Sequence, residues 1–122
     1  MNHLNVLMSL AVAAALSTSP VLAHEGAASE EVTVTGEVVD MVCYVDHEAS
    51  GTEHADCAQK CIEMGLPVGI KTKDGKLYLL IGEHEPINAA LAPLAAKTIT
   101  VKGNAVSRDG FNMIENVEIV TN

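Results

Sequence analysis

All three cysteines of the chain and two of its five histidines fall between residues 43 and 61. The members of this group are Cys43, His47, His54, Cys57 and Cys61. If residues 51–64 form a helix, a rotation of about 100° per residue places His54, Cys57 and Cys61 on one narrow stripe. Thiolate sulfur and imidazole nitrogen are the ligands that soft transition metals select. The spacing therefore predicts a metal site on one face of this helix.

Cys43 precedes the helix and is expected at the end of the first strand. From there its sulfur can approach the helix stripe and complete a Cys3His set of four ligands. His47, in the predicted loop, is an alternative nitrogen ligand, or a residue that hydrogen-bonds to a ligand from outside. The predicted site thus consists of Cys43, His54, Cys57 and Cys61, with His47 as the substitute.

The residue types leave two ions open. Three thiolates and one imidazole suit tetrahedral Zn²⁺, and they also suit Cu⁺, which prefers sulfur. Met64 lies near the cysteine stripe of the helix, and Met41 shares a strand face with Cys43, so thioethers favour Cu⁺ slightly over Zn²⁺, although methionine is an ordinary core residue. Three acids in the same region, Asp40, Asp46 and Asp56, would favour a cation there or simply be exposed.

An odd number of cysteines also allows other chemistry. Cys43 paired with either helix cysteine is the easier disulfide, whereas Cys57 and Cys61, one helical turn apart, are near the limit for an unstrained bridge. The alternatives are a thiol–disulfide redox protein, in which two cysteines cycle, and a non-catalytic binding module stapled by a structural disulfide. Buried, inert thiols are a further possibility.

The N-terminus predicts export. An apolar run from Val6 to Leu16 is too short to span a bilayer and is followed by Val21-Leu22-Ala23, which is typical of a signal peptide over residues 1–23 cleaved after Ala23. The expected location is periplasmic or secreted, and no later apolar run reaches transmembrane length. Cleavage there would expose His24, whose amine and imidazole together form a separate candidate Cu²⁺ chelate.

Composition and motifs narrow the function. The formal charge of −9 falls wholly after residue 23, and the only aromatic residues are Tyr44, Tyr78 and Phe111. An acidic chain with little to stack on bases is not expected to bind nucleic acid. The c-type haem signature and the common hydrolase, zinc-protease and nucleotide-binding motifs do not occur. A binding protein is therefore expected rather than an enzyme.

The elements that must position the site follow from local patterns. Residues 24–31 are expected to be a flexible arm, and β-branched residues over 32–44 predict a long first strand, with a bulge or sharp coil near Gly36. The helix over 51–64 should begin at a capping box of Ser50 and Glu53 and stop at Gly65. The remaining predicted elements are strands over 68–72, 76–81, 98–106 and 111–119, and a short helix over 86–92. Asp74-Gly75 and Asp109-Gly110 predict hairpin turns.

This order, with a helix between the third and fourth strands, is that of a five-stranded OB barrel. The segment Leu91-Ala-Pro-Leu-Ala-Ala-Lys-Thr-Ile-Thr-Val-Lys-Gly103, followed by Asp109-Gly110 and Asn116-Val-Glu-Ile119, resembles small exported bacterial OB-fold proteins. The resemblance implies a single OB-like domain over 32–122. Because OB barrels host unrelated functions, function should lie in the cysteine-bearing insertion. The expected partners are a metal ion and a periplasmic protein that accepts it.

Overall fold

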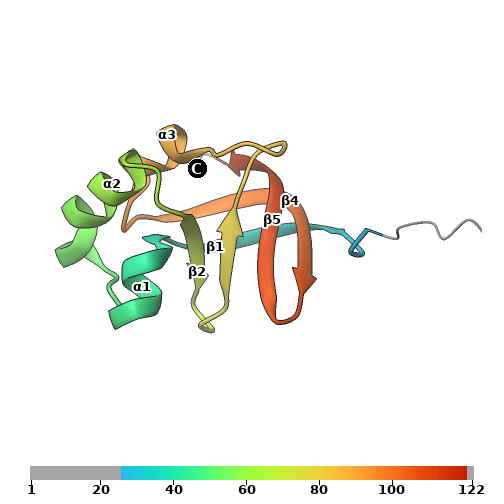
Figure 1. Ribbon diagram of the computed structural model, residues 1–122, viewed down its shortest axis with the longest axis horizontal. Helices are drawn as coiled ribbons and strands as arrows, with labels where there is room; N and C mark the ends of the chain where they lie inside the picture. Colours follow the sequence, from blue (N-terminus) through green and yellow to red (C-terminus); the bar gives the residue numbers. More distant parts are fainter. Residues whose placement is uncertain (1–25, 121–122) are drawn as a thin grey trace, which may run out of the picture.

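The computed structural model describes residues 26–120, and the predicted signal peptide and His24 lie outside this range. Five strands form a closed barrel in the order β1-β2-β3-β5-β4, as expected for an OB-like fold (Figure 1). The strands are β1 (Glu30–Asp40), β2 (Val68–Thr72), β3 (Leu77–Leu80), β4 (Thr98–Arg108) and β5 (Phe111–Val120). The parallel pairing of β3 with β5 closes the barrel, and the other neighbours are antiparallel.

Strand β1 is the hub of the barrel because it pairs with two neighbours. Its residues 30–37 pair with β4, and its residues 36–40 pair with β2. At the crossover, a Cβ on Gly36 would collide with the backbone carbonyl of Lys71, so only glycine allows this close approach. Neither pairing of β1 has a register shift near Gly36, so the bulge that was one of the two expectations is absent there. The strand begins at Glu30, within the segment predicted to be an arm, and ends at Asp40, four residues earlier than predicted.

Both predicted hairpin turns are confirmed. Gly75 has a positive φ in the turn between β2 and β3, and Asp109 and Gly110 both have positive φ between β4 and β5. The irregularity expected near Asn116 is also present. Asn116 has a φ of 53°, and the β4–β5 register shifts between Lys102 and Asn104. Local turn chemistry therefore accounts for the two hairpins.

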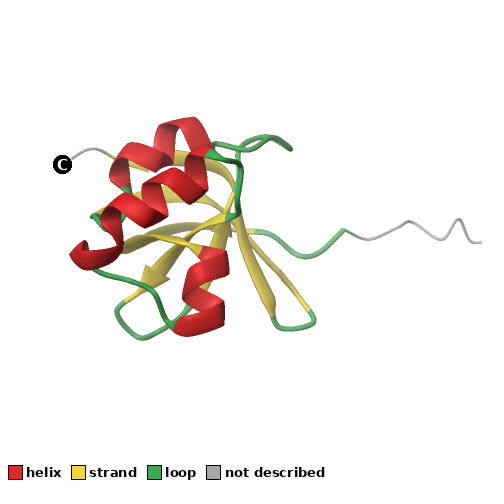
Figure 2. Cartoon of the chain, turned by 60° about the vertical axis from the view of Figure 1, so that its left-hand side comes forward, coloured by secondary structure: helices red, strands yellow, loops and turns green. Residues whose placement is uncertain are grey.

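The helices gather at one side of the barrel, as Figure 2 shows. They are α1 (Met41–His47), the 3-10 turn Thr52–His54, α2 (Ala55–Glu63), α3 (Asn88–Leu91) and the 3-10 turn Ala92–Leu94. Among residues 26–120 no helix is long and apolar enough to cross a bilayer. The predicted helices over 51–64 and 86–92 are confirmed in place. The short helix α1 was not predicted.

The barrel core extends into α2 and α3. It is built from apolar side chains that are almost fully buried: Val38, Ile62, Val68, Ile70, Leu80, Leu91, Ala92, Ala95, Val101 and Ile114. Ile62 comes from α2, and Leu91 from α3. The side-chain amide of Asn88 donates hydrogen bonds of 2.8 Å to the carbonyls of Ile62 and Leu66, and so joins α3 to the end of α2. The insertion is thus fixed to the barrel.

Candidate metal centre

Cys43 is carried by helix α1 and not by the end of a strand. Asp40 causes the change, because its Oδ1 accepts a hydrogen bond of 3.0 Å from the backbone N–H of Val42 and caps the first turn. The helix ends at Glu48, whose left-handed φ of 56° lets its N–H bond back to Tyr44. The strand pattern of β-branched residues was therefore misread across Asp40, which is itself a favourable N-cap residue.

Helix α2 carries the other two cysteines one turn apart. Ile62 follows Cys61, is fully buried in the core, and holds this helix against the barrel. The predicted capping box of Ser50 and Glu53 is wrong. Instead, the N–H of Gly51 donates to Glu37 Oε1 of β1, and a 3-10 turn without a side-chain cap precedes α2. A barrel residue therefore fixes the start of the insertion.

The two helices bring the three sulfurs together. The Sγ atoms of Cys43, Cys57 and Cys61 all lie within 4.8 Å of one another. All three cysteines are free, with Cys57 exposed and the other two half-buried. An ion bound at about 2.3 Å from each sulfur holds a pair of sulfurs at most about 4.6 Å apart. Small side-chain adjustments therefore suffice for one ion to contact all three.

His47 and His54 lie beside each other. Their rings are 6.5 Å apart between centroids, edge to face. His47 ends α1, is largely exposed, and places its Nδ1 3.2 Å from Asp46 Oδ2. His54 ends the 3-10 turn before α2. In residues 26–120, no histidine nitrogen lies within 4.8 Å of all three sulfurs. Coordination by His54, or by His47 in its place, stays a prediction.

The thioethers are arranged differently from the prediction. Because Met41 and Cys43 are two residues apart on a helix, they point about 200° apart and not to one face. Met41 packs against Gly69 of β2. Met64 follows α2 and is 75 % exposed. The placement of Met41 removes one of the two arguments for Cu⁺ over Zn²⁺.

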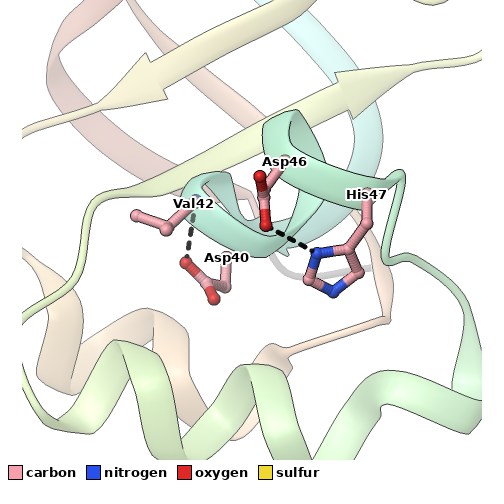
Figure 3. Close-up of polar contacts among 4 residues, drawn as sticks. All are labelled: Asp40, Val42, Asp46 and His47. Carbon is pink, nitrogen blue, oxygen red and sulfur yellow. Dashed lines mark hydrogen bonds and ion pairs between the residues drawn. The ribbon is translucent and has the colours of Figure 1, made fainter.

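Asp40 is the residue of this region whose burial the sequence did not indicate. It is 1 % exposed, and its carboxylate lies between α1 and α2 (Figure 3). While Oδ1 caps the helix, Oδ2 is enclosed and has no hydrogen-bond partner of ordinary geometry. Asp46 and Asp56, in contrast, are exposed. A sequence signal for Asp40 existed, since an aspartate before a helical turn is typical of an N-cap.

The carboxylate of Asp40 acts on two of the thiols. Hydrogen bonding of the Cys43 thiol to Asp40, followed by burial and by the negative charges around it, raises the pKa of Cys43 from 9.0 to about 12. Burial, and then the charge of Asp40, raises the pKa of Cys61. Both thiols therefore hold their protons at neutral pH in the absence of a counter-charge. A bound cation would reverse this preference, because it stabilises thiolate.

The fold and this geometry define a closed five-stranded OB-like barrel with a cluster of three cysteines on two inserted helices. Comparison of the chain with protein-family models, curated proteins and solved structures finds no match. The functional argument therefore depends on the cluster itself.

Proposed function

We propose that the protein binds one soft transition-metal ion, Cu⁺ or Zn²⁺, and serves as a carrier or buffer of that ion outside the cytoplasm. The observation that carries the proposal is the convergence of three free sulfurs to within 4.8 Å from two separate helices. Cys43, Cys57 and Cys61 are the proposed ligands. His54, or His47 in its place, is the proposed fourth ligand, which the predicted Cys3His set requires.

Accessibility supports a carrier or buffer. Cys57 is exposed and the other two sulfurs are half-buried, so an ion held there has an open side toward water. An open side allows a second protein to take over the ion by ligand exchange. The predicted signal peptide over residues 1–23 supports an exchange in the periplasm or outside the cell, with a metal-accepting protein as the proposed partner.

The test is native mass spectrometry of the exported, reduced protein with Zn²⁺ and, separately, with Cu⁺ under anaerobic conditions. One bound ion per chain is expected, and Cys57→Ser should lose it. Gln59→Ser is the matched control, because it introduces the same residue at a half-buried position of the same helix, where the side chain bonds to Glu63, and it should keep the ion. A wild-type chain that stays free of metal at saturating concentrations of both ions would overturn the proposal.

The proximity of the sulfurs also favours a second candidate, a thiol–disulfide redox protein. Two sulfurs within 4.8 Å form a disulfide after a modest rotation of their side chains. Against it, the raised pKa values of Cys43 and Cys61 reduce the thiolate that such exchange requires. Equilibration in glutathione buffers measures the reduction potential of the cysteine pair. A reduction potential below about −300 mV would indicate a structural bridge, and a higher one a redox-active pair.

A further inference from the structure

The carboxylate of Asp40 does more than cap a helix. Capping uses Oδ1 alone, and the cap needs no negative charge, because serine and asparagine cap equally well. Its Oδ2 is enclosed without a hydrogen bond from an N–H or O–H group, and the donors beside the carboxylate are the weakly donating thiols of Cys43 and Cys61. A charge buried in this way is costly unless it is paired. The fold therefore contains a buried carboxylate that the cap does not explain.

The described protein supplies no cation to pair with this charge. Among residues 26–120 the ion pair found is that of His47 with Asp46, and no lysine or arginine nitrogen lies within 4.0 Å of Asp40. The groups beside it are thiols, since Asp40 acts on both Cys43 and Cys61. Once a cation displaces the thiol protons, three thiolates and the carboxylate next to them form a strongly anionic pocket. Such a pocket attracts a cation, and attracts it in proportion to the charge of the cation.

We propose that Asp40 is a positioning and charge-compensating residue of the three-cysteine site, and that its carboxylate makes the site select a divalent soft ion of the Zn²⁺ class over Cu⁺. This inference rests on the proposed metal-binding function and names the ion. No carboxylate oxygen of the described residues lies within 4.8 Å of all three sulfurs, and the proposal gives Asp40 a place beside the ligands. Its N-cap bond meanwhile sets the start of the helix that carries Cys43.

The charge role and the purely structural role give different results. A misplaced α1 would weaken the binding of every ion that needs Cys43. Loss of the Asp40 charge would weaken a divalent ion more than a monovalent one, because the Coulomb attraction scales with the charge of the ion. The ratio of the two affinities therefore reports the charge role alone.

The experiment uses Asp40→Asn, which keeps an N-cap oxygen of the same shape and removes the charge. Affinities for Zn²⁺ and Cu⁺ are measured by competition with chelators of known affinity, and Co²⁺ is used as a spectroscopic probe of thiolate coordination. We expect the Zn²⁺ and Co²⁺ affinities to fall about tenfold or more, and the Cu⁺ affinity to fall several-fold less. Glu63→Gln is the matched control, because it removes one carboxylate charge from an exposed position of α2.

Equal losses for both ions in Asp40→Asn, or no loss for either, would overturn the inference while leaving the proposed function intact. Failure of the wild-type chain to bind any ion would instead overturn the proposed function. Circular dichroism verifies that each variant folds. Should Asp40→Asn fail to fold, Asp40→Ser supplies a second neutral cap, and the same change in the Zn²⁺ to Cu⁺ ratio is expected.

Discussion

Two junctions of the barrel each use an aspartate, and they use it differently. At the turn between β2 and β3, the hydroxyl of Thr72 donates to Asp74 Oδ1, and this hydrogen bond lowers the pKa of Asp74. That aspartate is exposed and well supplied with donors. At the junction of β1 and α1, Asp40 is buried, and one of its oxygens has no partner of ordinary geometry.

The difference separates an acid with a structural role from the acid for which we propose a function. A carboxylate with its donors in place, facing water, stabilises a turn and has no further requirement. A carboxylate enclosed beside three thiols requires a counter-charge that the described protein does not provide. The β2–β3 turn is therefore complete as it stands, whereas we propose that a bound cation completes the β1–α1 junction.

The largest effect on stability is expected at Ile62, because this residue anchors α2, the helix that carries Cys57 and Cys61. Ile62 is fully buried beneath α2, so Ile62→Ala should reduce the free energy of unfolding by about 2–5 kcal/mol. Urea denaturation of the metal-free protein measures it. Val42→Ala, at a 46 % exposed position of α1, is the control and should change stability by about 0.5 kcal/mol or less. A similar small loss in both variants would mean that α2 is loosely attached.

A ligand that completes the β1–α1 junction must also stabilise the fold. At a free Zn²⁺ concentration of about one hundred times the dissociation constant, linkage predicts a gain of about 2.7 kcal/mol in the free energy of unfolding. Thermal denaturation with and without the ion measures this gain. Cys61→Ser should show almost none of it, since it removes one of the three sulfurs. A gain of equal size in Cys61→Ser would locate the ion elsewhere on the chain.

How much of these two regions the sequence predicts depends on whether the signal is local. The β2–β3 turn follows from Asp74-Gly75 between two apolar runs, and the closed barrel follows from similar signals. The meeting of the three sulfurs was also predicted. The burial of Asp40 was not, because it depends on α1 and α2 closing over it, and β-branched residues 42 and 45 favoured a strand where the cap favours a helix. The N-cap of Asp40, rather than β propensity, decided the conformation of that segment, and tertiary packing decided the burial of Asp40.

The metal-free junction should be sensitive to alkali. The folded protein raises the pKa of Cys43 from the ordinary 9.0 to about 12. Above about pH 9 the unfolded chain therefore loses this proton while the folded protein keeps it, and this difference favours unfolding. The resulting stability is complete below about pH 9 and is lost as the pH rises toward 12. With a chelator and a reductant present, the urea midpoint of the wild type should fall more between about pH 8 and pH 10.5 than that of Cys43→Ser. Tyrosines and lysines titrate in both proteins, so an equal fall would contradict the assignment.

The smallest effect on stability is expected at Asp74, in the turn between β2 and β3. The pKa of Asp74 lies below its ordinary value of 3.8, so its contribution to stability is present above that pH and is lost as the pH falls through the lowered value. Asp74→Asn keeps an oxygen that can accept from Thr72, and it should melt slightly below the wild type at about pH 7 and level with it at about pH 2. Differential scanning calorimetry at the two pH values measures this. Zn²⁺ affinity should stay within about twofold, because water and salt screen an exposed charge. A loss of affinity as large as that of Asp40→Asn would remove the distinction between the two aspartates, and selectivity would then follow from net charge alone.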